Sequence, residues 1–170
     1  MLSLNRPLSA RNLAAGPLIC LVLAPASATA VGIRQPLQFF SGRTEMISTV
    51  KVMAKKPYRS RTMGNGRMLP DGSLALVQQV FDDGKSPAQR NWKMHQIGPG
   101  RYAGTMSDAI GPVLVEEVNG SYRFKFRMKG GVSIEQWLTP VPGAEAAKSN
   151  MTARKFGLQV ATSQGIVRRI

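Results

Sequence analysis

The sequence predicts an all-β protein, namely a single antiparallel up-and-down β-barrel of about 8–10 strands that follows a cleaved N-terminal signal peptide. Turn signals rich in Gly, Asn, Asp and Pro recur at short intervals from Phe39 onward, and no segment keeps a helical period over three turns with capping signals at both ends. About eight to ten strands is also the size at which an antiparallel sheet closes on itself, which removes its exposed edges. The apolar N-terminus predicts the signal peptide.

Residues 1–30 have the composition of a secretory signal peptide. Two arginines precede an apolar run at residues 13–24, and small residues follow it up to Ala30. The run contains Gly and Pro and is shorter than the about 20 residues that a membrane-spanning helix needs, so we interpret it as cleaved. We expect the barrel domain to comprise residues 31–170 and to be exported to the periplasm or cell envelope.

Two alternatives for the N-terminus stay open. One is a cytosolic protein with an apolar N-terminal segment, and the other is a lipoprotein attached through Cys20, the sole cysteine. Ile19 stands before this cysteine, where a lipidation signal has a small residue. Cleavage after Ala30 removes Cys20, so the mature protein is expected to form no disulfide in an oxidising compartment.

The chain is strongly basic, with a formal net charge of +14. Such a charge predicts attraction to polyanions. An exported protein meets lipid head groups, lipopolysaccharide and acidic polysaccharide rather than chromosomal DNA, so we expect no nucleic-acid partner. The basic residues are spread along the predicted strands instead of forming a tail, and a merely basic, soluble surface is the simpler interpretation.

The clearest strand is residues 122–129, in which every even position is apolar and every odd position is cationic. This alternation predicts one face in the core and one face in water. Asn119-Gly120 precedes the strand and is a strong two-residue hairpin signal, because both residues tolerate the positive φ of a type I′ turn. We therefore expect residues 113–118 to pair antiparallel with residues 122–129.

Further strands are predicted wherever β-forming runs lie between turn signals: residues 45–53, 59–67, 73–81, 90–97, 101–107, 132–139, 151–156 and 158–167. Residues 140–148 are rich in Pro, Gly and Ala and are predicted to form a mobile loop between late strands. No internal repeat or domain linker is present, so one domain is expected.

The inventory of reactive residues is small. His95 is the sole histidine, so a Ser-His-Asp triad would have to use His95 itself. A metal site with several histidines is excluded. The chain carries no Walker-type loop and no CxxC pair. Alternation places His95 beside Lys93 on the solvent side of its strand, so we expect a surface histidine. No catalytic residue, metal or cofactor is predicted.

Several local patterns occur in a fixed order along residues 39–165. They are Phe39-Phe-Ser-Gly42, Asp82-Asp83-Gly84, Arg90-x-Trp92, Gly100-Arg-Tyr102-x-Gly104-x-x-x-Asp108-x-x-Gly111, Gln136-Trp137-Leu138 and Lys155-Phe156-Gly157. In this order they resemble an uncharacterised bacterial family, domain of unknown function 3833. The resemblance implies a calycin-like barrel, the broad class that includes lipocalins, with no established activity. Many members of that family look like envelope lipoproteins.

Arg90 and Trp92 are the most informative pair, because their spacing places both on one strand face. An inward arginine needs a carboxylate or carbonyl partner, since burying an unpaired guanidinium costs several kcal/mol. Asp108, Glu117 and Glu135 are the candidate partners. Two interpretations of Arg90 stay open. It forms a structural ion pair with a carboxylate over Trp92, or it binds an anion in a pocket. If the pair is buried, Arg90→Ala should destabilise the fold by about 3–5 kcal/mol.

The apolar stripe of residues 122–128 predicts a filled core or the lining of a cavity. Gln136 interrupts the corresponding stripe of the next strand, and an inward polar group must be hydrogen-bonded to protein, water or a ligand. This favours a cavity. The predicted ligand-binding residues are Arg90, Trp92, Tyr102, Gln136 and Trp137.

Three functions are compatible with these residues. The favoured one is an exported, non-enzymatic protein that binds a small hydrophobic or amphipathic, lipid-like ligand inside the barrel. The second is an enzyme acting on a lipid-like substrate, with Arg90 and Tyr102 orienting an oxygen anion and Asp108 or Glu117 as the base. The third is a binder of anionic membrane or polysaccharide surfaces through the cationic face of residues 122–129.

Overall fold

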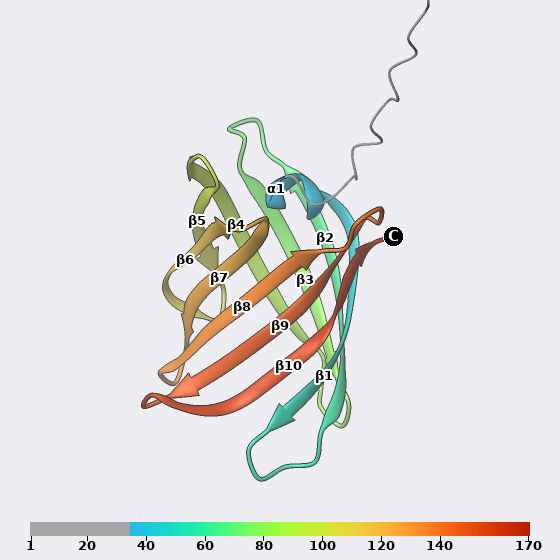
Figure 1. Cartoon of the computed structure of the whole chain (residues 1–170), viewed down its shortest axis with the longest axis vertical. Coiled ribbons are helices and arrows are strands. Elements are labelled where there is room, and N and C mark those ends of the chain that lie inside the picture. Colours follow the sequence, from blue (N-terminus) through green and yellow to red (C-terminus); the bar gives the residue numbers. More distant parts are fainter. Residues whose placement is uncertain (1–34) are drawn as a thin grey trace, which may run out of the picture.

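The computed structural model describes residues 35–170, which form a closed barrel of ten antiparallel strands. Each strand pairs with its neighbours in sequence, and β1 closes the barrel by pairing with β10 (Figure 1). The predicted class, a single up-and-down barrel, is confirmed. The predicted signal peptide and Cys20 lie outside the described residues.

The elements follow one another with short connections. They are α1 Pro36–Phe39, β1 Gly42–Val52, β2 Tyr58–Met68, β3 Leu74–Asp82, β4 Ala88–Gly98, β5 Arg101–Met106, β6 Ala109–Val118, β7 Ser121–Met128, β8 Val132–Pro140, β9 Ala146–Lys155 and β10 Leu158–Arg169. Within residues 35–170, no helix is long and apolar enough to cross a bilayer.

The predicted hairpin is present as β6 and β7. Asn119 and Gly120 have φ values of 50° and 74°, as a type I′ turn requires, and Val118 pairs with Ser121. Tyr122 and Phe124 are buried, whereas Lys125 is exposed, so the alternation of β7 separates core from solvent as predicted.

Two expectations need correction. The expected loop at residues 140–148 is confined to residues 141–145, because β8 extends to Pro140, β9 begins at Ala146, and the backbone N–H of Val141 donates to the carbonyl of Ala146 at 2.9 Å. Ala147 is fully buried, so a small apolar side chain that suggested a loop instead packs against the core. The helix α1 was not predicted, because a single turn is too short to show a helical period.

The two ends of the barrel differ. The capped end carries α1 (Figure 1). Leu37 and Phe39 of this helix are buried in the hydrophobic core. Arg169 fastens α1 by donating from Nη1 to the carbonyl oxygen of Gln38 at 3.2 Å. The far end consists of the turns at residues 53–57, 83–87, 107–108, 129–131 and 156–157, with no covering helix in the described chain.

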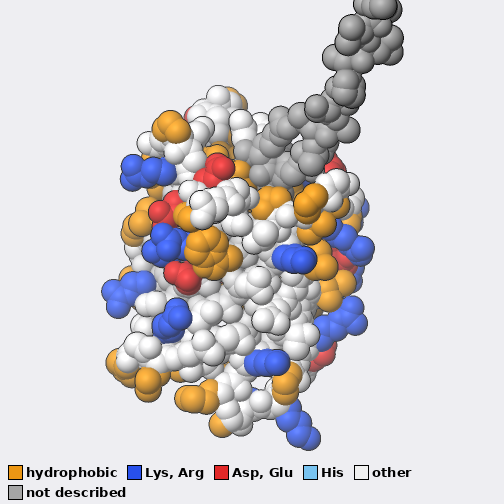
Figure 2. All heavy atoms as spheres, viewed as in Figure 1, with side chains coloured by type: hydrophobic (Ala, Val, Ile, Leu, Met, Phe, Trp, Pro, Cys, Tyr) orange, Lys and Arg blue, Asp and Glu red, His pale blue; other side chains and the backbone are white. Residues whose placement is uncertain are grey.

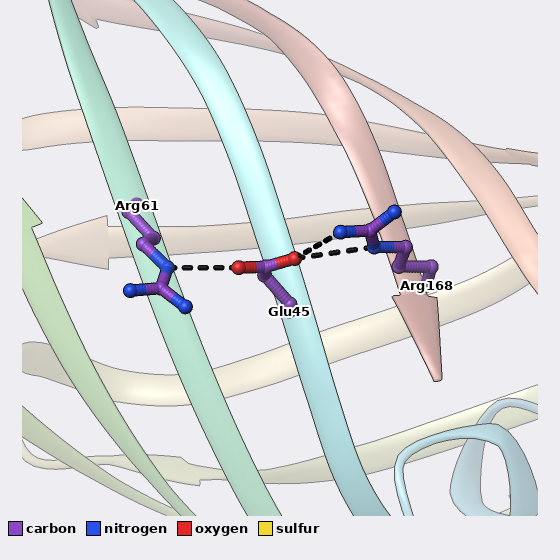
Figure 3. Close-up of polar contacts among 3 residues, drawn as sticks. All are labelled: Glu45, Arg61 and Arg168. Atoms are coloured by element: carbon purple, nitrogen blue, oxygen red, sulfur yellow. Dashed lines mark hydrogen bonds and ion pairs between the residues drawn. The ribbon is translucent and has the colours of Figure 1, made fainter. Parts of the chain in front are cut away.

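The first and last strands are joined on their outer face by an ion network. The carboxylate of Glu45 accepts from Nε of Arg61 on β2 at 2.8 Å and from Nη2 of Arg168 on β10 at 2.6 Å (Figure 3). Thr44 and Met46 line the interior, so alternation turns Glu45 outward, where the arginines leave it only 6% exposed. The hydrogen bonds and charges of Arg168 and Arg61 outweigh the effect of desolvation and lower the pKa of Glu45.

Candidate functional site

The barrel encloses a cavity of about 120 Å³. Its lining residues come from α1 and from every strand: Pro36, Leu37, Phe40, Thr44, Met46, Thr62, Leu74, Leu76, Gln78, Arg90, Trp92, Met94, Tyr102, Val115, Phe124, Phe126, Gln136, Leu138, Ser149, Met151, Ser163 and Val167. An engineered apolar cavity of about 150 Å³ is enough to bind benzene. The volume therefore accommodates a small ring or a short alkyl chain.

The lining of the cavity is not evenly buried. Leu74 and Leu138, which line it near α1, are buried. Arg90, Trp92 and Phe126, which lie nearer the far end, are partly exposed. Solvent therefore reaches the lining beside Arg90, Trp92 and Phe126, whereas interior residues of other strands toward the far end, such as Val80 and Ile134, are buried.

Trp92 forms the centre of an aromatic wall. Its ring meets the ring of Phe126 on β7 edge to face, with centroids 5.8 Å apart and an interplanar angle of 84°. Its indole Nε1–H donates to Oε1 of Gln78 on the neighbouring strand at 2.8 Å. The hydrogen bond fixes the ring, so the apolar face of Trp92 is presented to the cavity in a defined orientation.

Arg90 lies on the same face of β4 as Trp92, as predicted, and its partner is Asp108. Nε of Arg90 donates to Oδ2 of Asp108 at 3.1 Å. The side chains are 34% and 37% exposed, so this pair is not buried. The expected destabilisation of about 3–5 kcal/mol is therefore too large, because a pair this exposed contributes about 1 kcal/mol or less. Of the three nitrogens of the Arg90 guanidinium, only Nε has a hydrogen-bond or ion-pair partner among residues 35–170.

Asp108 itself has a structural role. It follows Ser107 in the two-residue turn between β5 and β6, where its Oδ1 accepts from the hydroxyl of Ser107 at 3.2 Å. Both carboxylate oxygens are therefore engaged, one by Arg90 and one by the turn. This arrangement is that of a turn-bound carboxylate and does not favour Asp108 as a general base.

Polar groups also line the wall opposite the aromatic side chains. Nε2 of Gln136 on β8 donates to Oγ of Ser149 on β9 at 2.9 Å, which satisfies the amide that the sequence places inside. Thr44, Thr62 and Ser163 line the same side of the cavity. The sequence contains one sign of this polar wall. Small hydroxyl residues stand at alternate positions of strands that otherwise lack an apolar stripe.

Two tyrosines lie in the interior toward the capped end. Burial, together with the negative charge of Glu117, raises the pKa of Tyr102, which lines the cavity. Burial and the charge of Glu117 also raise the pKa of Tyr122 to about 12. Both phenols therefore keep their protons at neutral pH, so the Tyr102 hydroxyl is a neutral group at the cavity wall.

The structure places four of the predicted ligand-binding residues in the cavity lining, namely Arg90, Trp92, Tyr102 and Gln136. Trp137 lies on the outer face of β8, where its Nε1–H donates to Oε1 of Glu135 at 3.1 Å and Arg123 lies 5.3 Å from its ring. Alternation explains the difference, because residue 137 faces away whenever residue 136 faces inward.

The predicted surface position of His95 agrees with the structure, in which this side chain is exposed. Within the described part of the chain, no three His, Cys, Asp or Glu residues are arranged to hold a metal ion. The cationic face of β7 is partly neutralised, because Glu116 accepts from Nε of Arg123 at 2.9 Å and lies 3.8 Å from Nζ of Lys125.

Fold and cavity together define a lipocalin-like β-barrel with a ligand-sized interior. The barrel is similar to the solved structure of an S-type phycobiliprotein lyase from Guillardia theta, with a TM-score of 0.63 and 7% sequence identity over 79% of this chain and 90% of that one. No family model matches the chain. No curated protein matches it either.

Proposed function

We propose that the protein is an exported, non-enzymatic binder of a small amphipathic ligand, with the ligand's apolar part in the barrel and its anionic end at Arg90. The observation that carries the proposal is the position of Arg90. It lines the cavity beside Trp92 and is 34% exposed, and Asp108 pairs with only its Nε. The terminal nitrogens of a guanidinium form a planar fork that suits a carboxylate or phosphate.

The division of the cavity supports an amphipathic ligand. Its inner part is lined by buried apolar side chains such as Leu74 and Leu138, whereas Arg90 marks the more exposed side. A volume of about 120 Å³ accepts an alkyl chain or ring but no large cofactor. A ligand with a polar end would therefore insert its apolar part first and leave its charge near Arg90, where the electrostatic interaction is favourable.

The two tryptophans of the chain provide a direct test, because Trp92 lines the cavity and Trp137 lies outside it. In Trp137→Phe, octanoate should change the fluorescence of the remaining Trp92 in a saturable way. In the matched control Trp92→Phe, the same titration should leave the fluorescence of Trp137 unchanged. An equal response of both tryptophans, or of neither, contradicts ligand binding in the barrel.

The role of Arg90 is tested by the charge of the probe. Octylamine has the same chain length as octanoate but a positive charge, so Trp137→Phe should respond more weakly to octylamine. Arg90→Ala should remove this preference while lowering the free energy of unfolding by only about 1 kcal/mol. Arg90→Lys should retain part of the preference, because it keeps the charge and loses the fork. A large loss of stability with an unchanged preference would show that Arg90 serves only as a clamp.

A further inference from the structure

Two neighbouring hairpin tips at the far end expose apolar side chains. Phe156 is 92% exposed, Leu158 69% and Met53 64%, and these are the three most exposed large hydrophobic residues of the described chain. Phe156 and Leu158 belong to the β9–β10 hairpin, and Met53 follows β1. The hairpins are adjacent, since the backbone N–H of Met53 donates to the carbonyl of Val160 at 2.9 Å. In Figure 2, hydrophobic and basic side chains gather at this lower edge of the molecule.

The same two segments are basic. Residues 51–57 and 154–159 contain no carboxylate but carry five cations: Lys51, Lys55, Lys56, Arg154 and Lys155. All five are exposed, and within residues 35–170 none of them is recorded in an ion pair. We call the three apolar residues and these five cations the tip surface. Its charge is therefore available to an external anion.

The carboxylates at this end of the barrel belong to other turns. Asp82 lies 2.8 Å from Nζ of Lys85 in the β3–β4 connection, and Asp108 is paired with Arg90. Within the described chain, neither carboxylate forms an ion pair with the tip surface. Asp83, in the same connection as Lys85, accepts from the backbone N–H of Arg59 at 3.2 Å, and it too forms no ion pair with the tip surface, so within the described chain no salt bridge neutralises the five cations.

Phe156 adopts a left-handed backbone conformation, which is unfavourable for a bulky aromatic residue. Its φ of 52° and the φ of 79° at Gly157 define the same kind of two-residue turn as Asn119-Gly120. Asparagine tolerates this left-handed region, whereas a bulky aromatic residue there is an outlier that is held at an energetic cost. With 92% of its surface exposed, Phe156 packs little against the fold, although Nζ of its neighbour Lys155 lies 5.7 Å from the centre of its ring. Turn geometry disfavours an aromatic residue here, and burial in the core does not explain it.

An anionic lipid bilayer has the chemistry that matches the tip surface. Its interfacial region accepts apolar side chains, and its head groups attract the surrounding cations. A second copy of the chain would bring the five cations of one tip surface against those of another, which opposes self-association. Lysine side chains can also lie along the interface with their charges in the head-group layer while the apolar tips insert.

We propose that the tip surface docks the far end of the barrel onto an anionic lipid bilayer, with Phe156, Leu158 and Met53 inserted into the interface. This docking goes beyond the proposed ligand binding and does not depend on it.

The test is co-sedimentation of the full chain with vesicles of phosphatidylcholine and phosphatidylglycerol, compared with vesicles of phosphatidylcholine alone. Wild-type protein should bind the anionic vesicles more tightly, and raising the salt from low to physiological concentration should weaken that binding. Every variant retains residues 1–34, so a contribution of that segment is common to all samples. Equal binding to both vesicle types would overturn the proposal.

The decisive variant is Phe156→Asn, which copies the residue of the Asn119 turn. We expect it to lower the vesicle partition coefficient about tenfold, because one aromatic side chain no longer inserts. Its thermal unfolding midpoint should stay the same or rise, so loss of binding will not reflect loss of folding. The matched control is Ile97→Asn, an exposed apolar residue at the capped end, which should bind as wild type does. Unchanged binding by Phe156→Asn would overturn the proposal.

The basic residues are tested by a pair of double variants. Lys55→Gln/Lys56→Gln should weaken binding to anionic vesicles about 25-fold, at about fivefold for each cation close to the surface. The control Arg67→Gln/Arg101→Gln removes the same charge from the capped end and should have a much smaller effect. Equal effects would show that only net charge matters. If Phe156→Asn instead abolishes a concentration-dependent dimer in sedimentation, the tip surface is a self-association site and the proposal fails.

The outcome is separable from that of the proposed function. Octanoate binding, measured through Trp92 in Trp137→Phe, requires no vesicle, and adding Phe156→Asn should leave it unchanged. Loss of vesicle binding with intact octanoate binding identifies the tip surface alone as the docking element.

Discussion

The capped end and the far end of the barrel are built from the same strands but organised in opposite ways. At the capped end, α1 buries Leu37 and Phe39, and the guanidinium of Arg169 donates a hydrogen bond to the carbonyl oxygen of Gln38 in this helix. At the far end, Arg90 and Trp92 are partly exposed and the hairpin tips project apolar side chains. The difference is that a helix closes one end of the barrel, whereas the other end exposes side chains that are able to meet ligands and surfaces.

The largest change in stability that this comparison predicts concerns two phenylalanines of one strand. Phe124 and Phe126 both face the interior from β7, but Phe124 is buried, whereas Phe126 is partly exposed toward the far end. Phe124→Ala should lower the free energy of unfolding by about 3–5 kcal/mol, the range for buried phenylalanines. Phe126→Ala should cost less, because water already reaches its ring. Urea denaturation measures both, and equal losses would mean that the two ends are packed alike.

A pH-dependent effect of intermediate size is expected from Glu45. Its carboxylate bridges Arg61 and Arg168 across the seam between β2, β1 and β10, and its pKa is lowered from the usual 4.5. A lowered pKa in the folded state contributes stability that is present above the unfolded pKa and is lost as the pH falls through the folded pKa. Wild type should therefore exceed Glu45→Gln in stability at neutral pH.

The advantage of wild type over Glu45→Gln should begin to shrink as the pH falls through about 4.5 and should continue to shrink below it. Thermal melts of both proteins from neutral to acidic pH provide the measurement. Glu145→Gln is a suitable control, because its carboxylate is exposed and lies 3.8 Å from Nε of Arg169. A constant difference between wild type and Glu45→Gln at every pH would show that the network does not titrate with folding.

The sequence predicted what alternation controls. Even positions of β7 faced inward and Arg90 shared a face with Trp92, because side-chain direction in a strand has a period of two. The barrel's closure followed from the number of strands. Asp108 could be named as a candidate partner of Arg90 because it carries a carboxylate, but choosing it over Glu117 required the strand register.

What alternation does not control could not be predicted. The degree of exposure of Arg90 depends on which side chains cover it in the closed barrel, and α1, a single helical turn, leaves no period in the sequence. The ion network of Glu45 joins residues 123 positions apart, so local patterns contain no trace of it. Trp137 was placed in the site for its residue type, although its odd position predicted the outer face.

The smallest expected effect distinguishes the two type I′ turns. Asn119 at the capped end and Phe156 at the far end have φ values of 50° and 52°, and each is followed by a glycine with positive φ. Phe156→Asn should raise the free energy of unfolding by about 1 kcal/mol, because asparagine adopts the left-handed region with less strain. Asn119→Phe should lower it by a similar amount. The double exchange should give nearly the sum of the two changes, since the turns lie at opposite ends and share no partner.

Chemical denaturation of the four proteins measures this exchange, with the slope of the transition checked for constancy so that only stability changes. The sign for Phe156→Asn is the critical result. If stability rises, the folded protein tolerates local strain at the far end in order to keep an exposed aromatic side chain, as docking requires. If stability falls, Phe156 makes a contact that favours the folded state, and the contrast between a packed end and a projecting end no longer applies to this hairpin.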